Sequence, residues 1–110
     1  MNVFLDNKNL HGDYRIVANC LRVGKSNAIR LSDIMKIADI KDRRYAYSII
    51  ERLINRYNLP IVASKRGEHK GYYYPADKDE FIEAISSIER HIDSMNKRHD
   101  NLIKNYSEVN

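Results

Sequence analysis

Apolar residues recur at helical spacing in three successive segments of the first sixty residues. The first helix is predicted to begin at the N-cap residue Asp13 and to end at Gly24. A second helix is predicted after the cap residue Ser32, and a third from Asp42 to about Asn58, with only a tight turn between them. The residues predicted to face the core are Ile16, Val17, Cys20, Leu21, Ile34, Met35, Ile37, Ala38, Ala46, Ile49, Ile50, Leu53, Ile54 and Tyr57.

A β-hairpin is predicted after the third helix. Pro60 suits the start of a strand over residues 59–64, and residues 72–74, all tyrosine, favour a return strand. The loop between them, residues 65–71, holds two glycines and several cations. Because side chains alternate along a strand, Tyr73 should face away from Tyr72 and Tyr74, so at least one tyrosine packs on the helices. Residues 28–30 are predicted to form a further short extended segment.

From residue 77 to about residue 106 the chain contains no proline or glycine, which predicts one long helix. Its apolar positions, beginning at Phe81, alternate at spacings of four and three residues, the heptad pattern of a coiled coil. A helix of about 29 residues is about 44 Å long, more than a domain of about 75 residues covers. We therefore expect a homodimer, in which the helices pair parallel or antiparallel or each helix crosses the partner's domain. The predicted dimerisation residues are Ile85, Ile88, Ile92, Met95, His99, Leu102 and Tyr106.

The order of elements predicts a mainly helical α+β fold. Helix, short strand, helix, turn, helix and hairpin follow one another as in a winged helix-turn-helix, here with a long C-terminal helix. We divide the chain into a flexible arm (residues 1–12), a winged-helix domain (residues 13–76) and the long helix (residues 77–110).

Three short motifs strengthen this interpretation. Residues 21–29 (LRVGKSNAI), 58–61 (NLPI) and 71–75 (GYYYP) resemble the small winged-helix proteins of Gram-positive phages and related mobile elements. The resemblance spans roughly residues 14–105. It implies binding of duplex DNA, in transcriptional control or in phage or plasmid replication. The loop at residues 65–71 is longer and more charged than the short Ser/Gly wing of that family.

The amino-acid composition limits the classes of protein to which the chain can belong. With 43% hydrophobic and 31% charged residues, the chain has the balance of a folded domain. A single cysteine, Cys20, excludes an intrachain disulfide and a zinc finger, and its place in an apolar stripe predicts a buried, inert thiol. Neither a signal peptide nor a membrane-spanning stretch is recognisable, so we expect a cytoplasmic protein.

Charge is concentrated in the middle of the chain. The net charge is +4, but residues 41–73 hold eight Lys or Arg against three Asp or Glu, whereas residues 74–110 hold five against eight. Such asymmetry favours a polyanion as the partner of the middle segment. Arg43 and Arg44 begin the third helix, where a cation opposes the helix dipole and where recognition helices meet the major groove. The predicted DNA-binding residues are Lys41, Arg43, Arg44, Tyr47, Ser48, Arg52, Lys65, Arg66, His69 and Lys70.

We expect no enzymatic activity, no metal and no cofactor. The four histidines lack the spacing of a metal site, and no nucleophile and base can be placed together. The alternative to DNA binding is an adaptor or inhibitor in which the same scaffold captures a replication or host-defence protein. DNA binding with a steep salt dependence would favour the first function, and salt-insensitive capture of a protein the second.

Overall fold

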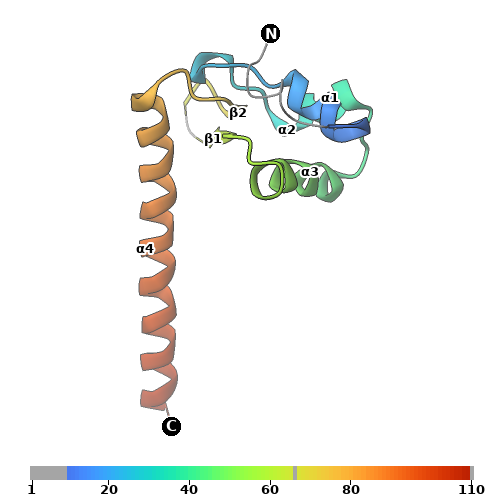
Figure 1. The fold of residues 1–110 in the computed structure, drawn as a ribbon. Coiled ribbons are helices and arrows are strands. Elements are labelled where there is room, and N and C mark those ends of the chain that lie inside the picture. Colours follow the sequence, from blue (N-terminus) through green and yellow to red (C-terminus); the bar gives the residue numbers. More distant parts are fainter. Residues whose placement is uncertain (1–9, 66, 110) are drawn as a thin grey trace.

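The computed structural model describes residues 10–65 and 67–109, which form four α-helices, one short 3₁₀ helix and two β-strands. This mainly helical fold with a small antiparallel sheet confirms the predicted α+β class. Helices α1 to α3 and the sheet pack together, and α4 extends from them as a rod (Figure 1), so that the longest extent of the molecule is 58 Å. The elements are α1 (Gly12–Cys20), η1 (Lys25–Asn27), α2 (Leu31–Ala38), α3 (Arg43–Asn55), β1 (Val62–Ser64), β2 (Gly71–Tyr73) and α4 (Lys78–Val109).

Helix α1 differs from its prediction at both ends. Its N-cap is His11, so Asp13 lies within the first turn, where a carboxylate still interacts favourably with the helix dipole. The helix ends at Cys20 and not at Gly24, because Leu21 leaves it in an extended conformation and is buried in the core. Gly24 has a φ of 102° and donates its N–H to a carbonyl of the sheet region, that of Tyr74, at 2.8 Å. Gly24 therefore takes part in a tertiary contact and does not end the helix.

Helix α2 begins two residues earlier than expected. Arg30 is the N-cap residue, and its carbonyl accepts the N–H of Ile34 at 3.0 Å, so the prediction of Ser32 as the cap was wrong. Asp39 ends the helix in the left-handed conformation, with a φ of 54°. Aspartate adopts this conformation more readily than most residues because its short side chain can bond locally.

Helix α3 begins as predicted. The side chain of Asp42 accepts the backbone N–H of Arg44 at 3.0 Å, which makes Asp42 the N-cap. The helix ends at Asn55, three residues before the predicted end. Asn58 then turns the chain with a φ of 60°, and Leu59 is buried. The strand expected from residue 59 begins only at Val62.

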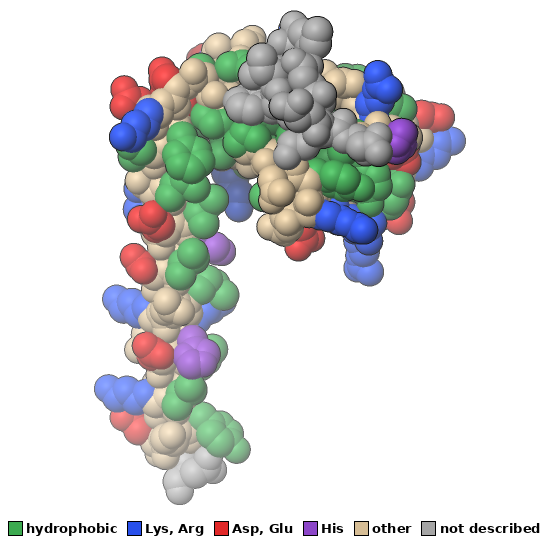
Figure 2. All heavy atoms as spheres, in the orientation of Figure 1, with side chains coloured by type: hydrophobic (Ala, Val, Ile, Leu, Met, Phe, Trp, Pro, Cys, Tyr) green, Lys and Arg blue, Asp and Glu red, His purple; other side chains and the backbone are tan. Residues whose placement is uncertain are grey.

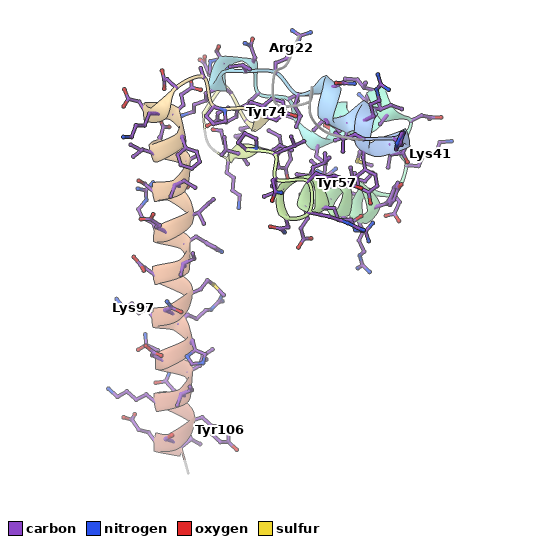
Figure 3. The ribbon with its side chains drawn as sticks, viewed as in Figure 1. Arg22, Lys41, Tyr57, Tyr74, Lys97 and Tyr106 are labelled. Atoms are coloured by element: carbon purple, nitrogen blue, oxygen red, sulfur yellow. The ribbon has the colours of Figure 1, made fainter. Side chains whose placement is uncertain are left out.

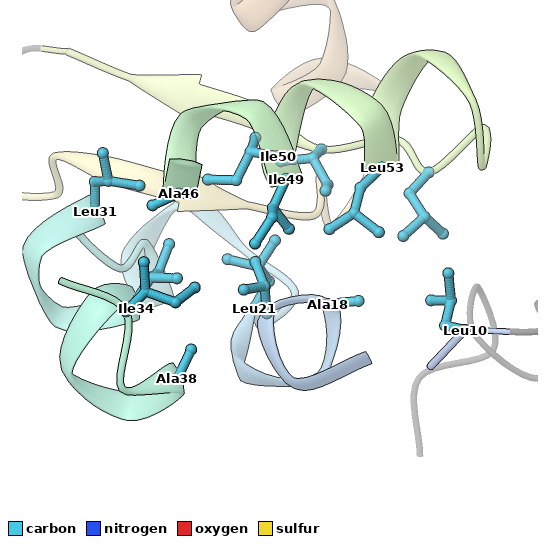
Figure 4. Close-up of a cluster of buried hydrophobic side chains, with 14 of the residues drawn as sticks. Leu10, Ala18, Leu21, Leu31, Ile34, Ala38, Ala46, Ile49, Ile50 and Leu53 are labelled. Atoms are coloured by element: carbon cyan, nitrogen blue, oxygen red, sulfur yellow. The ribbon is translucent and has the colours of Figure 1, made fainter. Parts of the chain in front are cut away.

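The hydrophobic core lies between the three short helices and the sheet (Figure 4). Leu10 belongs to this core although it was assigned to a flexible arm; residues 1–9 of that arm lie outside the described part. Ile16, Ile37 and Ile54 were predicted to face inward and are exposed, because a domain this small lacks the elements to cover every side of its helices. The buried residues are Leu10, Val17, Ala18, Leu21, Leu31, Ile34, Ala38, Ile40, Ala46, Ile49, Ile50, Leu53, Leu59, Ile61 and Tyr74.

The sheet joins the hairpin to the segment before α2. Strands β1 and β2 pair with Val62 opposite Tyr73. Ile29, in the predicted extended segment, exchanges two backbone hydrogen bonds of 3.0 and 2.8 Å with Tyr72. Gly71 makes this pairing possible: its φ is 134°, and a Cβ at this position would lie 2.3 Å from the carbonyl oxygen of Ile29. No other residue fits there without moving the backbone.

The three tyrosines alternate as predicted. Tyr72 and Tyr74 pack against the main core, and Tyr74 donates its hydroxyl to a carbonyl of α1 at 3.0 Å. Tyr73 is buried on the other side, in a second cluster with Val62 of β1 and Ala84 of α4. Burial raises the pKa of both Tyr73 and Tyr74. These rings therefore fill cores.

Helix α4, the predicted long helix, is anchored at its first turns. Asp77 accepts the N–H of Glu80 at 2.9 Å. The carboxylate of Glu80 in turn accepts the backbone N–H of Lys25 at 3.1 Å, and the ammonium of Lys25 forms an ion pair with Glu83. The hydrogen bond with Glu83 raises the pKa of Lys25. Together with the packing of Ala84 on the hairpin, these contacts fix the direction in which α4 leaves the domain.

Candidate nucleic-acid interface

The exposed face of α3 carries most of the predicted DNA-binding residues. Arg43, Arg44 and Tyr47 are exposed in its first two turns. Arg44 uses only its backbone N–H for the Asp42 cap, and its side chain extends into solvent. Ser48 is half-buried and donates its hydroxyl to a carbonyl of the preceding turn at 2.7 Å. The N-terminal end of α3 therefore presents two guanidinium groups, and Figure 2 shows Lys and Arg side chains protruding from the domain on this side.

On one edge of α3 an arginine lies close to a tyrosine ring. The guanidinium carbon of Arg43 lies 6.0 Å from the centre of the Tyr47 ring. Burial raises the pKa of Tyr72 in β2, and Tyr47 and Arg43 are close enough to influence it electrostatically. Exposed cation–π contacts contribute only about 0.5–1 kcal/mol. Arg43 is thus held loosely over the Tyr47 ring and stays accessible to a ligand.

The opposite edge of α3 is bonded to α1. Arg52, predicted to contact DNA, donates to the hydroxyl of Tyr14 at 2.8 Å, and this hydrogen bond raises the pKa of Arg52. Tyr45 donates its hydroxyl to Asp13 at 2.8 Å, which raises the pKa of Tyr45. The ring of Tyr14 also lies against Tyr57, with 5.4 Å between ring centres. In this structure Arg52 positions α3 against α1, a contact between residues 38 apart that no local pattern in the sequence indicates.

The hairpin loop supplies further cations. Lys65, His69 and Lys70 are all exposed, and Gly67 turns the loop with a φ of 83°. Arg66, the remaining predicted loop residue, lies outside the described residues. The loop leads directly into β2, whose Tyr72 is influenced electrostatically by Arg43 of α3.

No described carboxylate neutralises these cations. Within residues 10–65 and 67–109, Lys25 forms an ion pair with Glu83 and His99 lies beside Asp100, and both contacts lie elsewhere. Lys41 is exposed in the turn before α3, far from α4 (Figure 3). A surface whose described cations are not paired with carboxylates can neutralise a polyanion without first breaking internal ion pairs.

The predicted dimerisation residues lie along one side of α4. Beyond the anchored turns the seam is open to solvent: the exposed fractions of Ile88, Ile92, Met95, Leu102 and Tyr106 lie between 46% and 73%. Ile85, closer to the domain, is half-buried. His99 is exposed, and its Nδ1 lies 3.1 Å from an oxygen of the adjacent Asp100. Hydrophobic and histidine side chains line one side of the rod, with charged side chains on the other (Figure 2).

Among the described residues, none of the helices is long and apolar enough to cross a membrane. The same part of the chain contains no cluster of three His, Cys, Asp or Glu side chains placed to hold a metal ion. Comparisons of the chain with protein-family models, with curated proteins and with solved structures found no match.

Proposed function

We propose that the protein binds duplex DNA through the N-terminal half of α3 and the hairpin loop. The observation that carries the proposal is the pair of exposed arginines, Arg43 and Arg44, at the start of a helix whose dipole disfavours them. Their guanidinium groups suit guanine edges in the major groove, and Lys65 and Lys70 suit the phosphate backbone. A helix fits the major groove, and its N-terminal residues usually contact the bases.

The arrangement of elements supports a winged helix as the proposed fold. The order of α1, an extended segment at Ile29, α2, α3 and a hairpin is that of a winged helix-turn-helix, and Ile29 pairs with β2. In this proposal α3 is the recognition helix and residues 65–70 are the wing. The resemblance to proteins of mobile elements extends the proposal to transcriptional control or replication of a phage or plasmid.

The test is a salt titration of binding to a short duplex, followed by fluorescence anisotropy. The logarithm of the binding constant should fall linearly with the logarithm of salt, with a slope of about −0.9 per phosphate contact. Lys65→Ala with Lys70→Ala should reduce the steepness by up to about 1.8 and weaken all sequences alike. The matched control, Lys97→Ala with Lys104→Ala, removes the same charge from α4 and should leave the slope unchanged.

A second candidate function is capture of another protein, favoured by the exposed apolar side chains of α4. In that case duplex DNA would bind weakly, and the α3 and loop variants would behave like the control. Binding of the protein partner would then depend on Ile92 and Leu102 and change little with salt.

A further inference from the structure

The proposed function leaves the apolar side of α4 unexplained. Ala84 is the only buried residue among those described in this helix, and the seam beyond it meets no other element. A monomer would keep this side in water, at a cost of about 25 cal/mol for each Å² of apolar surface left uncovered. The side is too long and too regular to be scattered surface hydrophobicity, which is normal only as single residues.

We infer that a second copy of the chain covers this side, with the two α4 helices antiparallel and centred between residues 93 and 94. The inference goes beyond the proposed function, in which α3 and the hairpin loop of one chain bind DNA. With this centre, every seam residue meets a seam residue of the other copy, and no layer is left without a partner. The layers, each formed twice, are Phe81 with Tyr106, Ile85 with Leu102, Ile88 with His99, and Ile92 with Met95.

The residues that flank the seam favour this direction over the parallel one. Ile82 and Ile103 lie outside the seam, yet both are apolar and exposed, by 49% and 57%. Ile82 and Ile103 lie on the same side of the seam. In an antiparallel pair this side of one helix adjoins the same side of the other helix, so Ile82 of one copy lies beside Ile103 of the other at both ends. In a parallel pair, Ile103 would instead lie beside Arg98 of the second copy. The antiparallel pair thus widens the apolar contact at its two ends.

The charge along α4 points the same way. Its first half, residues 78–93, holds five Asp or Glu and two Lys or Arg, a net charge of −3. Its second half, residues 94–109, holds two Asp or Glu and three Lys or Arg, a net charge of +1. Antiparallel helices place the acidic half of each copy beside the basic half of the other, and their dipoles also oppose. Parallel helices would set the two acidic halves side by side.

The anchored end of α4 leaves room for the second copy. The hairpin covers the flank that carries Ala84, whereas Ile82 on the other flank remains open. The C-terminal end of the partner helix can therefore approach from the side of Ile82 without displacing Tyr73 from Ala84. His99 would be a polar residue within an apolar seam, a feature that selects one register at some cost in stability.

The test uses disulfide exchange between single-cysteine variants in a Cys20→Ala background, without DNA. Ile88→Cys and His99→Cys should join each other when the two proteins are mixed in a glutathione buffer. Neither should join to itself, because identical positions would lie about 16 Å apart along the axis, whereas a disulfide needs Cα atoms within about 7 Å. Lys97→Cys, on the outer side of α4 (Figure 3), is the control and should remain monomeric on a non-reducing gel.

Two outcomes would overturn the inference. Self-joining of each variant, without a disulfide between Ile88→Cys and His99→Cys in the mixture, would show parallel helices. The second outcome is that no covalent dimer forms and that light scattering shows the wild type to be a monomer at about 100 μM. That result would show that no second copy covers the seam. Leu102→Asp should separate the copies while the circular dichroism of the domain is retained. Either failure leaves the salt titration intact as a separate test of DNA binding.

Discussion

Arg44 offers a test in which stability and function should change in opposite directions. It lies in the first turn of α3, with an exposed side chain, and only its backbone N–H bonds to the Asp42 cap. Replacing it with alanine keeps the cap and removes a cation from the positive end of the helix dipole. We therefore expect Arg44→Ala to raise the free energy of unfolding by about 0.3–1 kcal/mol at low ionic strength. That gain corresponds to a rise in Tm of roughly 2–6 °C for a domain of this size.

The same substitution should weaken DNA binding. A bidentate contact with guanine contributes about 1–3 kcal/mol of discrimination, so affinity for the preferred site should fall about 5- to 150-fold. Preference at one base position should be lost, which selection of bound fragments from a random duplex library would detect. Thermal unfolding followed by circular dichroism gives the stability change. Repeating it at 1 M salt should abolish the gain, since the dipole effect is screened.

Arg56 is the matched control for this experiment. It caps the C-terminal end of the same helix, where a cation interacts favourably with the dipole. Arg56→Ala should therefore lower the Tm slightly and leave base preference intact. A lower Tm for Arg44→Ala, or unchanged affinity and site preference in that variant, would contradict the argument that DNA contact explains the position of this arginine.

Three other predictions concern stability and reactivity. Gly71→Ala should lower the free energy of unfolding by at least about 2 kcal/mol in urea denaturation, because the new Cβ meets the carbonyl of Ile29; a loss no larger than at exposed Gly67 would contradict this. Glu80→Ala should cost about 1–2 kcal/mol and Glu80→Gln less, since the amide oxygen can still accept the N–H of Lys25. Burial raises the pKa of the Cys20 thiol from 9.0 to about 11, so labelling by a thiol reagent at pH 8 should be about a hundredfold slower in the native protein than in urea; equal rates would show an accessible thiolate.

Local signals in the sequence predicted those features that local chemistry decides. Asp42 caps α3 because an acidic side chain can reach the N–H two residues later, and this requires nothing beyond the segment itself. The alternation of Tyr72, Tyr73 and Tyr74 follows from the pleat of a strand in the same way. The long helix was predictable because no residue in it interrupts the pattern.

Errors arose where distant segments determine the outcome. Gly24 resembled a helix end, but its conformation serves the contact with Tyr74, fifty residues away in the chain. Ser32 is a good cap residue by type, yet α2 already begins at Leu31 because Ile29, just before it, is held by the sheet. The bonds from α3 to α1, including that of Arg52 to Tyr14, have no periodic signature at all. For the candidate site, the sequence therefore predicted the exposed cations and missed the groups that orient the helix bearing them.

Neighbouring side chains of β2 belong to two different contacts. Tyr72 packs against the main core and is influenced electrostatically by Arg43 and Tyr47 of α3, whereas Tyr73 packs against Ala84 of α4. A strand so short has little freedom to move one face independently of the other. In the proposed complex, a phosphate backbone bound to the loop would also hold the base of the long helix. Because the coupling between two binding events is reciprocal, dimer formation would then strengthen DNA binding by the same factor by which DNA strengthens the dimer.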